Sequence, residues 1–390
     1  MLPVIITIAC LAGIVPMLCY LAFIYWLDRY EREPWWLVLL VFLWGGLGGA
    51  GFGCCINTSV ISIVSSFAGG DTAEWVGPVI VAPLVEEVTK IAPLFVLLLL
   101  RQFDNQTDGI IYGAATGLGF AMTENISYFI DVGSSAGLAS MMVNIFVRTC
   151  FTALVHCCAS ASWGFCLGLV RYRHWFVRWF LVPPIGYLIA ISIHASWNGS
   201  ATWSTFKGDI ALQAGACAMV IVLALVMLAI TQLSLFIEHR MIKAMLTLEA
   251  AEGTLPAAHA LIIPYYLKRT RGGWLHHGIP QEQYVKAATL LAFRRKQAET
   301  ASGETRDALL DDVRKFRHEV RLLLAQAGPQ APLQAPPPGH WPQGPQGGGW
   351  NQGGSQGGGW NQGGPQGGGW NQGGGGGGGW NQSAPWAAAG

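Results

Sequence analysis

Two adjacent glutamates lie in the middle of an otherwise apolar run of helical length. Glu86 and Glu87 are followed by Lys90, three to four residues further on and therefore on the same side of a helix. A charged side chain near the centre of a bilayer costs roughly 2.5–3.5 kcal/mol, and crossing a membrane does not require one. The pair is therefore a candidate functional site, and Lys90 is placed to neutralise part of its charge.

Other ionisable side chains lie inside apolar runs, and their depths agree. Glu86, Glu124, His156 and His194 each lie about 14–15 residues from the basic end of their run, or ~21–23 Å at ~1.5 Å per helical residue. Four costly groups at one level on four helices predict a single shared site, nearer the outer face of the membrane. Asn198 follows His194 by four residues and therefore shares its helix face.

These residue types can hydrolyse an amide. Glu86 can activate water as a base and then protonate the leaving amine, and Asn198 can orient His194 or stabilise an oxyanion. His156 and His194 with a carboxylate such as Glu124 form a plausible zinc shell with an open water position. Alternatively, the histidines contact the water and the oxyanion without a metal, and spacing does not decide between the two.

Two other functional classes use the same residue types. A proton-coupled transporter relays protons along buried carboxylates and histidines, and a receptor or scaffold without catalysis is a third alternative. Among the neighbours, Phe120 is placed to wall the site and Arg148 to pair with one of its carboxylates. Cys157 and Cys158 follow His156 directly, but consecutive helical residues point about 100° apart, so we interpret both as packing residues.

The composition predicts an all-α polytopic membrane protein. Of the 390 residues, 52% are hydrophobic and only 12% charged, against about 25% charged in soluble domains. The net charge of +1 offers no basic surface for nucleic acid. The apolar runs predict about seven transmembrane helices in the lipid bilayer. These spans are, approximately, 2–27, 35–60, 76–100, 109–132, 140–170, 179–199 and 210–237.

The loops between these spans alternate in basic content. One side carries Arg29, Arg32, Arg101, Arg171, Arg173, Arg178, Arg240 and Lys243. The positive-inside rule therefore places the amino terminus outside and the carboxyl terminus in the cytoplasm. The first run has no basic start or clear cleavage site, so we expect a retained span rather than a signal peptide. The nine cysteines lie in apolar runs, which indicates small buried hydrophobes rather than disulfides.

Four motifs, in order and on four predicted spans, resemble those of the PrsW family of intramembrane proteases. They are Glu86-Glu87-x-x-Lys90, Phe120-x-x-x-Glu124-Asn125, His156 with Gly164 eight residues on, and His194-x-x-x-Asn198. Segments 28–34 and 108–120 are also similar, so the resemblance covers roughly residues 1–240. The wider superfamily contains the CAAX prenyl endopeptidases and Abi proteins, which carry Glu-Glu-x-x-x-Arg and Phe-x-x-x-His. Lys90 and Glu124 favour the PrsW branch.

The resemblance implies a membrane peptidase. Within it, Glu86 would activate the water with support from Glu87, and Asn198 would help to stabilise the oxyanion. The groups that would hold water or metal are Glu124, His156 and His194. The resemblance also implies site-1 cleavage of a membrane-anchored anti-sigma factor in a bacterial plasma membrane. The family is commonly grouped with metalloproteases, although related enzymes have been argued to use a metal-independent glutamate mechanism, so the metal stays open.

We divide the chain into three parts. Residues 1–240 form the PrsW-like transmembrane domain, 241–327 a small helical cytoplasmic segment, and 328–390 a disordered Gly/Trp/Asn/Gln-rich tail. Segment 305–325 predicts an amphipathic helix with an apolar side formed by Leu309, Leu310, Val313, Phe316, Val320 and Leu323. In the tail, Gly-Gly-Gly-Trp-Asn-Gln recurs every ten residues, and such Gly-rich sequence cannot bury enough surface to fold alone. Its tryptophans can contact a partner that the sequence does not name.

Overall fold

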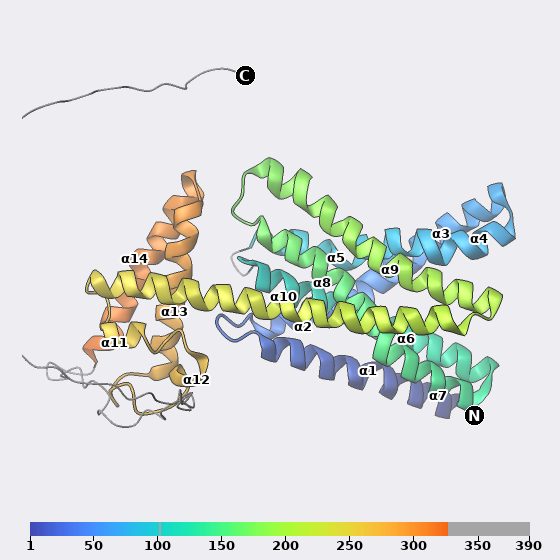
Figure 1. Cartoon of the computed structure of the whole chain (residues 1–390), viewed down its shortest axis with the longest axis horizontal. Coiled ribbons are helices and arrows are strands. Elements are labelled where there is room, and N and C mark those ends of the chain that lie inside the picture. The colour runs from blue at the N-terminus through green and yellow to red at the C-terminus, as the bar shows by residue number, and fades with distance from the viewer. Residues whose placement is uncertain (101–102, 327–390) are drawn as a thin grey trace, which may run out of the picture. The chain divides into compact units, whose positions relative to one another are not determined.

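The computed structural model describes residues 1–100 and 103–326, and every regular element in these ranges is helical (Figure 1). The first half contains α1 (Leu2–Leu27), α2 (Trp35–Leu43), η1 (Trp44–Gly49), α3 (Ala50–Ala68), α4 (Gly70–Val76), η2 (Gly77–Val81), α5 (Ala82–Leu97) and α6 (Gln106–Ser135). The second half contains α7 (Gly137–Val147), η3 (Arg148–Thr152), α8 (Ala153–Leu169), η4 (Val177–Leu181), α9 (Val182–Lys207), α10 (Ile210–Ala251), α11 (Ala257–Ala260), α12 (Tyr266–Arg269), α13 (Gln281–Thr300) and α14 (Gly303–Ala325).

Among the described residues, five helical segments are long and apolar enough to cross a membrane. They are Leu2–Leu27, Trp35–Ala68, Gly137–Leu169, Val177–Lys207 and Ile210–Ala251. The predicted count of about seven is therefore not confirmed. The other two predicted spans are helical, but α5 contains three charged residues and α6 is rich in glycine. Both helices are largely buried in the protein, so their sequences are shaped by protein contacts as well as by lipid.

Glycines set the spacing between α6 and its neighbours. A Cβ atom added at Gly117 would lie 2.3 Å from the carbonyl oxygen of His156 on α8, and one added at Gly45 would lie 2.0 Å from that of Thr116. No real Cβ atom tolerates such distances, so only glycine permits these backbones to approach so closely. The close packing brings α8, and with it His156, against α6.

Within residues 1–100 and 103–326, four π-helical segments, η1, η2, η3 and η4, interrupt the α-helices. Segment η2 lies one turn before Glu86, and η3 ends four residues before His156. A π turn inserts one extra residue and rotates the helix face that follows it, and such turns are frequent at functional sites. The local backbone therefore helps to direct both side chains.

The end of α10, helices α11, α13 and α14 and the residues that connect them share a second hydrophobic core. We call this region, which includes α12, the carboxyl-terminal unit. The predicted amphipathic helix is present as α14, with Leu309, Val313, Val320 and Leu323 buried. Helix α10 continues without a break past the predicted domain boundary at residue 240 to Ala251, and the boundary stays a prediction. The predicted disordered tail lies outside the described residues. The nine cysteines are all free, but only Cys157, Cys158 and Cys166 are buried, so the expected burial holds for three of them.

Candidate active site

Lys90 lies at the centre of a buried polar cluster. Its side chain is fully buried, and Nζ lies 2.8 Å from Glu87 Oε1 and 3.7 Å from Glu86 Oε2. The ring of Phe120 lies 3.9 Å below the ammonium group, so Phe120 walls the site as predicted and adds a cation–π contact. All three charged residues come from α5, where their three- and four-residue spacing places them on one face.

Glu87 holds this cluster together through both carboxylate oxygens. Oε1 accepts hydrogen bonds from Lys90 and from His194 Nδ1, each at 2.8 Å, and Oε2 accepts one from Ser160 Oγ at 3.2 Å. Because a carboxylate only accepts, His194 must carry its proton on Nδ1. Its Nε2 is then a free acceptor in the neutral ring. Glu87 is therefore a positioning group that fixes the tautomer and direction of His194.

His156 joins this cluster to a second ion pair. Its Nδ1 lies 2.9 Å from Lys90 Nζ, which donates, so the ring proton belongs on Nε2. That Nε2 lies 2.7 Å from Glu124 Oε2, and the same oxygen lies 2.9 Å from Arg148 Nη2. Arg148 also donates to Asn125 Oδ1 at 2.9 Å. The predicted pairing of Arg148 with a carboxylate is confirmed.

Glu86 differs from its neighbour in having one oxygen without a hydrogen-bond partner. Oε1 accepts from Asn57 Nδ2 of α3 at 3.0 Å. Oε2 is buried and has no hydrogen bond among the described residues, and it lies 3.8 Å from His194 Nε2. Glu86 Oε2 and His194 Nε2 are both hydrogen-bond acceptors, so a water molecule could donate one hydrogen bond to each of them.

The donor chemistry of the site fits a divalent metal. Glu87, His156 and His194 are buried, and their ligand atoms lie within 4.8 Å of one another. Two imidazoles and a carboxylate are a common zinc shell. The site also contains three carboxylates and two basic groups, so one negative charge is left for a cation or a proton to balance. Lys90 Nζ contacts two of the three donors, so a bound metal would compete with its ammonium group.

Sequence comparison identifies the family. The sequence profile of the PrsW family intramembrane metalloproteases matches residues 33–230, half of the chain. This chain belongs to the PrsW family. It is therefore a multi-pass membrane protein and an intramembrane peptidase. The comparisons do not favour the transporter alternative.

Proteins named Protease PrsW are similar to this PrsW-family chain. The one from Geobacillus kaustophilus is 28% identical over 178 residues, covering 44% of this chain and 73% of the relative. The one from Oceanobacillus iheyensis is 28% identical over 188 residues, covering 48% and 80%. The Bacillus subtilis protein is 28% identical over 182 residues, covering 41% and 68%. No solved structure matches the chain.

The structure brings together most of the PrsW-like residues that the sequence pointed to. Glu86, Glu87, Glu124, His156 and His194 lie in one contiguous network. Glu87 completes the close group with the two histidines, whereas Glu124, the carboxylate first predicted as a metal ligand, contacts His156 from its Nε2 side. The ligand role of Glu124 stays a prediction.

Asn198 forms a hydrogen bond to the backbone of η2. Its Nδ2 donates to the carbonyl oxygen of Pro78 in η2 at 2.9 Å, so one of its two amide hydrogens is engaged with the backbone. Its role in binding the oxyanion stays a prediction. Sequence reasoning missed Asn57 and Ser160. Asn57 is a lone amide in an apolar run, and Ser160 follows His156 by four residues on the same face, which were the available signals.

Proposed function

We propose that the chain hydrolyses a peptide bond in a membrane-anchored protein, with Glu86 as the general base. The observation that supports this most directly is Glu86 Oε2, which forms no hydrogen bond among the described residues and lies 3.7 Å from Lys90 Nζ and 3.8 Å from His194 Nε2. A water between Glu86 Oε2 and His194 Nε2 donates a hydrogen bond to each acceptor, which leaves an oxygen lone pair free to attack the scissile carbonyl. Glu86 takes the proton from that water and passes it to the leaving amine.

The remaining side chains position this pair. Asn57 fixes the other oxygen of Glu86, and Glu87 fixes His194 through Nδ1. Lys90 balances the two adjacent carboxylates in a low-dielectric site. Asn198 keeps one amide hydrogen for the oxyanion, four residues from His194. A divalent metal held by Glu87, His156 and His194, with zinc as the first candidate, would supply a Lewis acid and a more acidic water.

The test is cleavage of a single-span membrane substrate by the purified full chain in detergent. Glu86→Gln keeps the size and the hydrogen bond to Asn57 but cannot accept the proton, so cleavage is expected to fall by about 10²-fold or more. Glu74→Gln on α4 is the matched control because Glu74 is exposed. Equal cleavage by Glu86→Gln and the control would exclude the assignment of the base.

Chelation separates the two versions of the site. If a metal held by the two histidines is required, a chelator abolishes cleavage and added zinc restores it. If the chain's own residues suffice, chelated protein cleaves at the same rate and bound metal is absent by elemental analysis. Neither result tests Glu86 as the general base, which the Glu86→Gln variant tests separately.

We further propose that the substrate is a membrane-anchored anti-sigma factor, cut at site 1 in a bacterial plasma membrane. The substrate rests on the family resemblance, and the orientation rests on the basic loops, which favour an outer amino terminus and a cytoplasmic carboxyl terminus. The bacterial relatives agree with the setting. Co-expression with candidate anti-sigma factors tests the substrate, and failure to cut any of them while cutting another single-span protein would reject it.

A further inference from the structure

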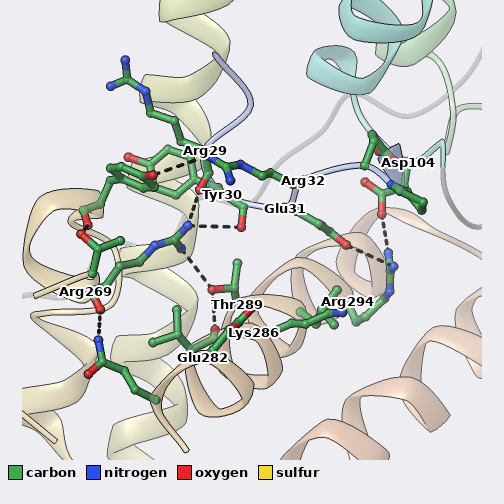
Figure 2. Close-up of a pocket in the computed structure, with 17 residues that line it drawn as sticks. Arg29, Tyr30, Glu31, Arg32, Asp104, Arg269, Glu282, Lys286, Thr289 and Arg294 are labelled. Carbon is green, nitrogen blue, oxygen red and sulfur yellow. Dashed lines mark hydrogen bonds and ion pairs between the residues drawn. The ribbon is translucent and has the colours of Figure 1, made fainter. Parts of the chain in front are cut away.

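A cavity of about 840 Å³ lies between residues 28–34, which link α1 to α2, and helices α12 and α13 (Figure 2). We call it the loop cavity. Residues on its wall include Arg32, Tyr266, Arg269, Lys286, Thr289 and Arg294. None of the residues that line it is part of the polar cluster around Glu86. Segments more than 200 residues apart in sequence form this cavity, so no local sequence motif predicts it.

Arg269 is buried in the wall of the loop cavity without a carboxylate partner. It is 7% exposed. Its guanidinium donates through Nη2 to the carbonyl oxygens of Arg29 and Tyr30 and through Nη1 to Thr289 Oγ1 (Figure 2). Among the described residues, no carboxylate lies within ion-pairing distance of it. A buried charge is normally paired, and burial lowers the pKa of Arg269 below its usual value.

Two further cations of the cavity lack a counter-ion. Arg32 donates only to neutral oxygens, the Asp28 carbonyl at 3.0 Å and the Tyr266 hydroxyl at 3.5 Å. Lys286 is exposed on α13, and neither it nor Arg32 forms an ion pair within the described ranges. Arg294 behaves differently, since it pairs with Asp104 at 2.5 Å and with Glu31 at 3.6 Å.

The acidic residues nearby do not balance these cations. Asp104 and Glu31 are used by Arg294, and Glu282 is the one exposed acid on the wall. Burial raises the pKa of Asp28 to about 7 and that of Glu33 to about 8, which reduces the negative charge of both near neutral pH. The wall of the cavity therefore carries an excess of positive charge.

We propose that the loop cavity binds a phosphate-bearing ligand, namely the headgroup of an anionic phospholipid, through Arg32, Arg269 and Lys286. Guanidinium and ammonium groups are the usual partners of phosphate oxygens. The position indicates a lipid source, because exposed Trp26, Trp35 and Trp36 flank the loop at the ends of two spans, where tryptophan marks the membrane interface. Basic pockets at that level bind acidic headgroups.

A ligand there joins two parts of the fold. Its phosphate contacts Arg32 on the loop between the first spans and Arg269 and Lys286 on the carboxyl-terminal unit. The occupied cavity therefore adds a link between residues 28–34 and α13 to the links that Arg269 and Arg294 already form.

The test is lipid binding by the purified full chain, measured by native mass spectrometry after transfer from nanodiscs of phosphatidylcholine with or without phosphatidylglycerol. Arg32→Gln/Lys286→Gln removes two cations at the cavity without touching the buried Arg269. Near a membrane surface each cation contributes about fivefold in affinity, so the double variant should bind phosphatidylglycerol about 25-fold more weakly. Lys296→Gln is the control, because that lysine is on α13 but pairs with Glu299 at 2.7 Å.

Three outcomes decide the proposal. Selective retention of phosphatidylglycerol that is lost in the double variant and kept in the control supports a lipid headgroup. Binding of inorganic phosphate with the same dependence on the variants, and no lipid selectivity, supports the phosphate site and replaces the lipid with a soluble source. Equal retention of both lipids with no phosphate binding, or unchanged binding by a folded double variant, overturns it.

Discussion

Replacing Lys90 with methionine tests whether its ammonium is what permits two adjacent carboxylates to be buried. Methionine keeps the length and the packing on Phe120 but removes the charge that lies 2.8 Å from Glu87 and 3.7 Å from Glu86. Removing one partner of a buried ion pair costs about 3–5 kcal/mol, because the other charge stays buried without compensation. At roughly 2–4 °C per kcal/mol for a folded unit of about 150–250 residues, the thermal midpoint of the transmembrane part should fall by about 6–20 °C.

A double-mutant cycle with Glu87 separates the electrostatic effect of Lys90 from its packing. Glu87→Gln removes the facing charge, so Lys90→Met/Glu87→Gln should be no less stable than Lys90→Met alone. Tryptophan fluorescence during heating in detergent measures all three variants. Lys243→Met, at an exposed position on α10, controls for loss of a lysine. Additive destabilisation in the double variant would refute the reasoning, since additive effects mean that the two side chains do not stabilise each other.

Three more predictions concern other parts of the chain. Asn57→Leu removes the amide that donates to Glu86 Oε1 at 3.0 Å, and losing a hydrogen bond to a charged group should lower kcat/KM by about 10–100-fold. Gly117→Val places a Cβ 2.3 Å from the carbonyl oxygen of His156, and such overpacking should lower the unfolding free energy by about 1–3 kcal/mol or more. Burial lowers the pKa of His259 to about 4. Between that value and about 6.5 the unfolded chain binds more protons, so His259 destabilises the protein as the pH falls through this window, and His259→Phe should flatten that slope.

Each of these has its own control and its own contrary result. Gly51→Val is the control for Gly117→Val, because a Cβ at Gly51 meets nothing within 4 Å, and equal thermal midpoints for the two would contradict the packing argument. Unchanged kcat/KM in a folded Asn57→Leu protein would remove Asn57 from the site. Parallel pH profiles of the thermal midpoint in wild type and His259→Phe would show that His259 does not cause the loss of stability between about pH 6.5 and 4.

The convergence of Glu86, His156 and His194 could be predicted from sequence because each is costly in a membrane. A buried charge or imidazole stands out against apolar neighbours, and its depth follows from counting residues along a helix. Asn57 was missed because a neutral amide is far less expensive and does not stand out. The direction of each ring could not be predicted either, since the hydrogen bonds that fix it come from other helices.

The number of spans was harder to predict for a related reason. Hydropathy measures how well a helix tolerates lipid, whereas α6 mostly contacts other helices and can be built from glycine, alanine and threonine. Helix α5 carries the charges of the site and so loses the apolar signature of a span. The four π segments have no sequence signal at all, because they differ from an α-helix only in which carbonyl each amide reaches.

Helix α10 is one uninterrupted rod of 42 residues, about 63 Å long at 1.5 Å per residue. Towards one end, Val220 packs with Val155 and Trp197, which lie close in sequence to His156 and His194. Near the other end, Ile242 and Leu246 belong to the core of the carboxyl-terminal unit. Because one continuous helix belongs to both clusters, a rotation of α10 in the carboxyl-terminal unit would also change the packing beside His156 and His194.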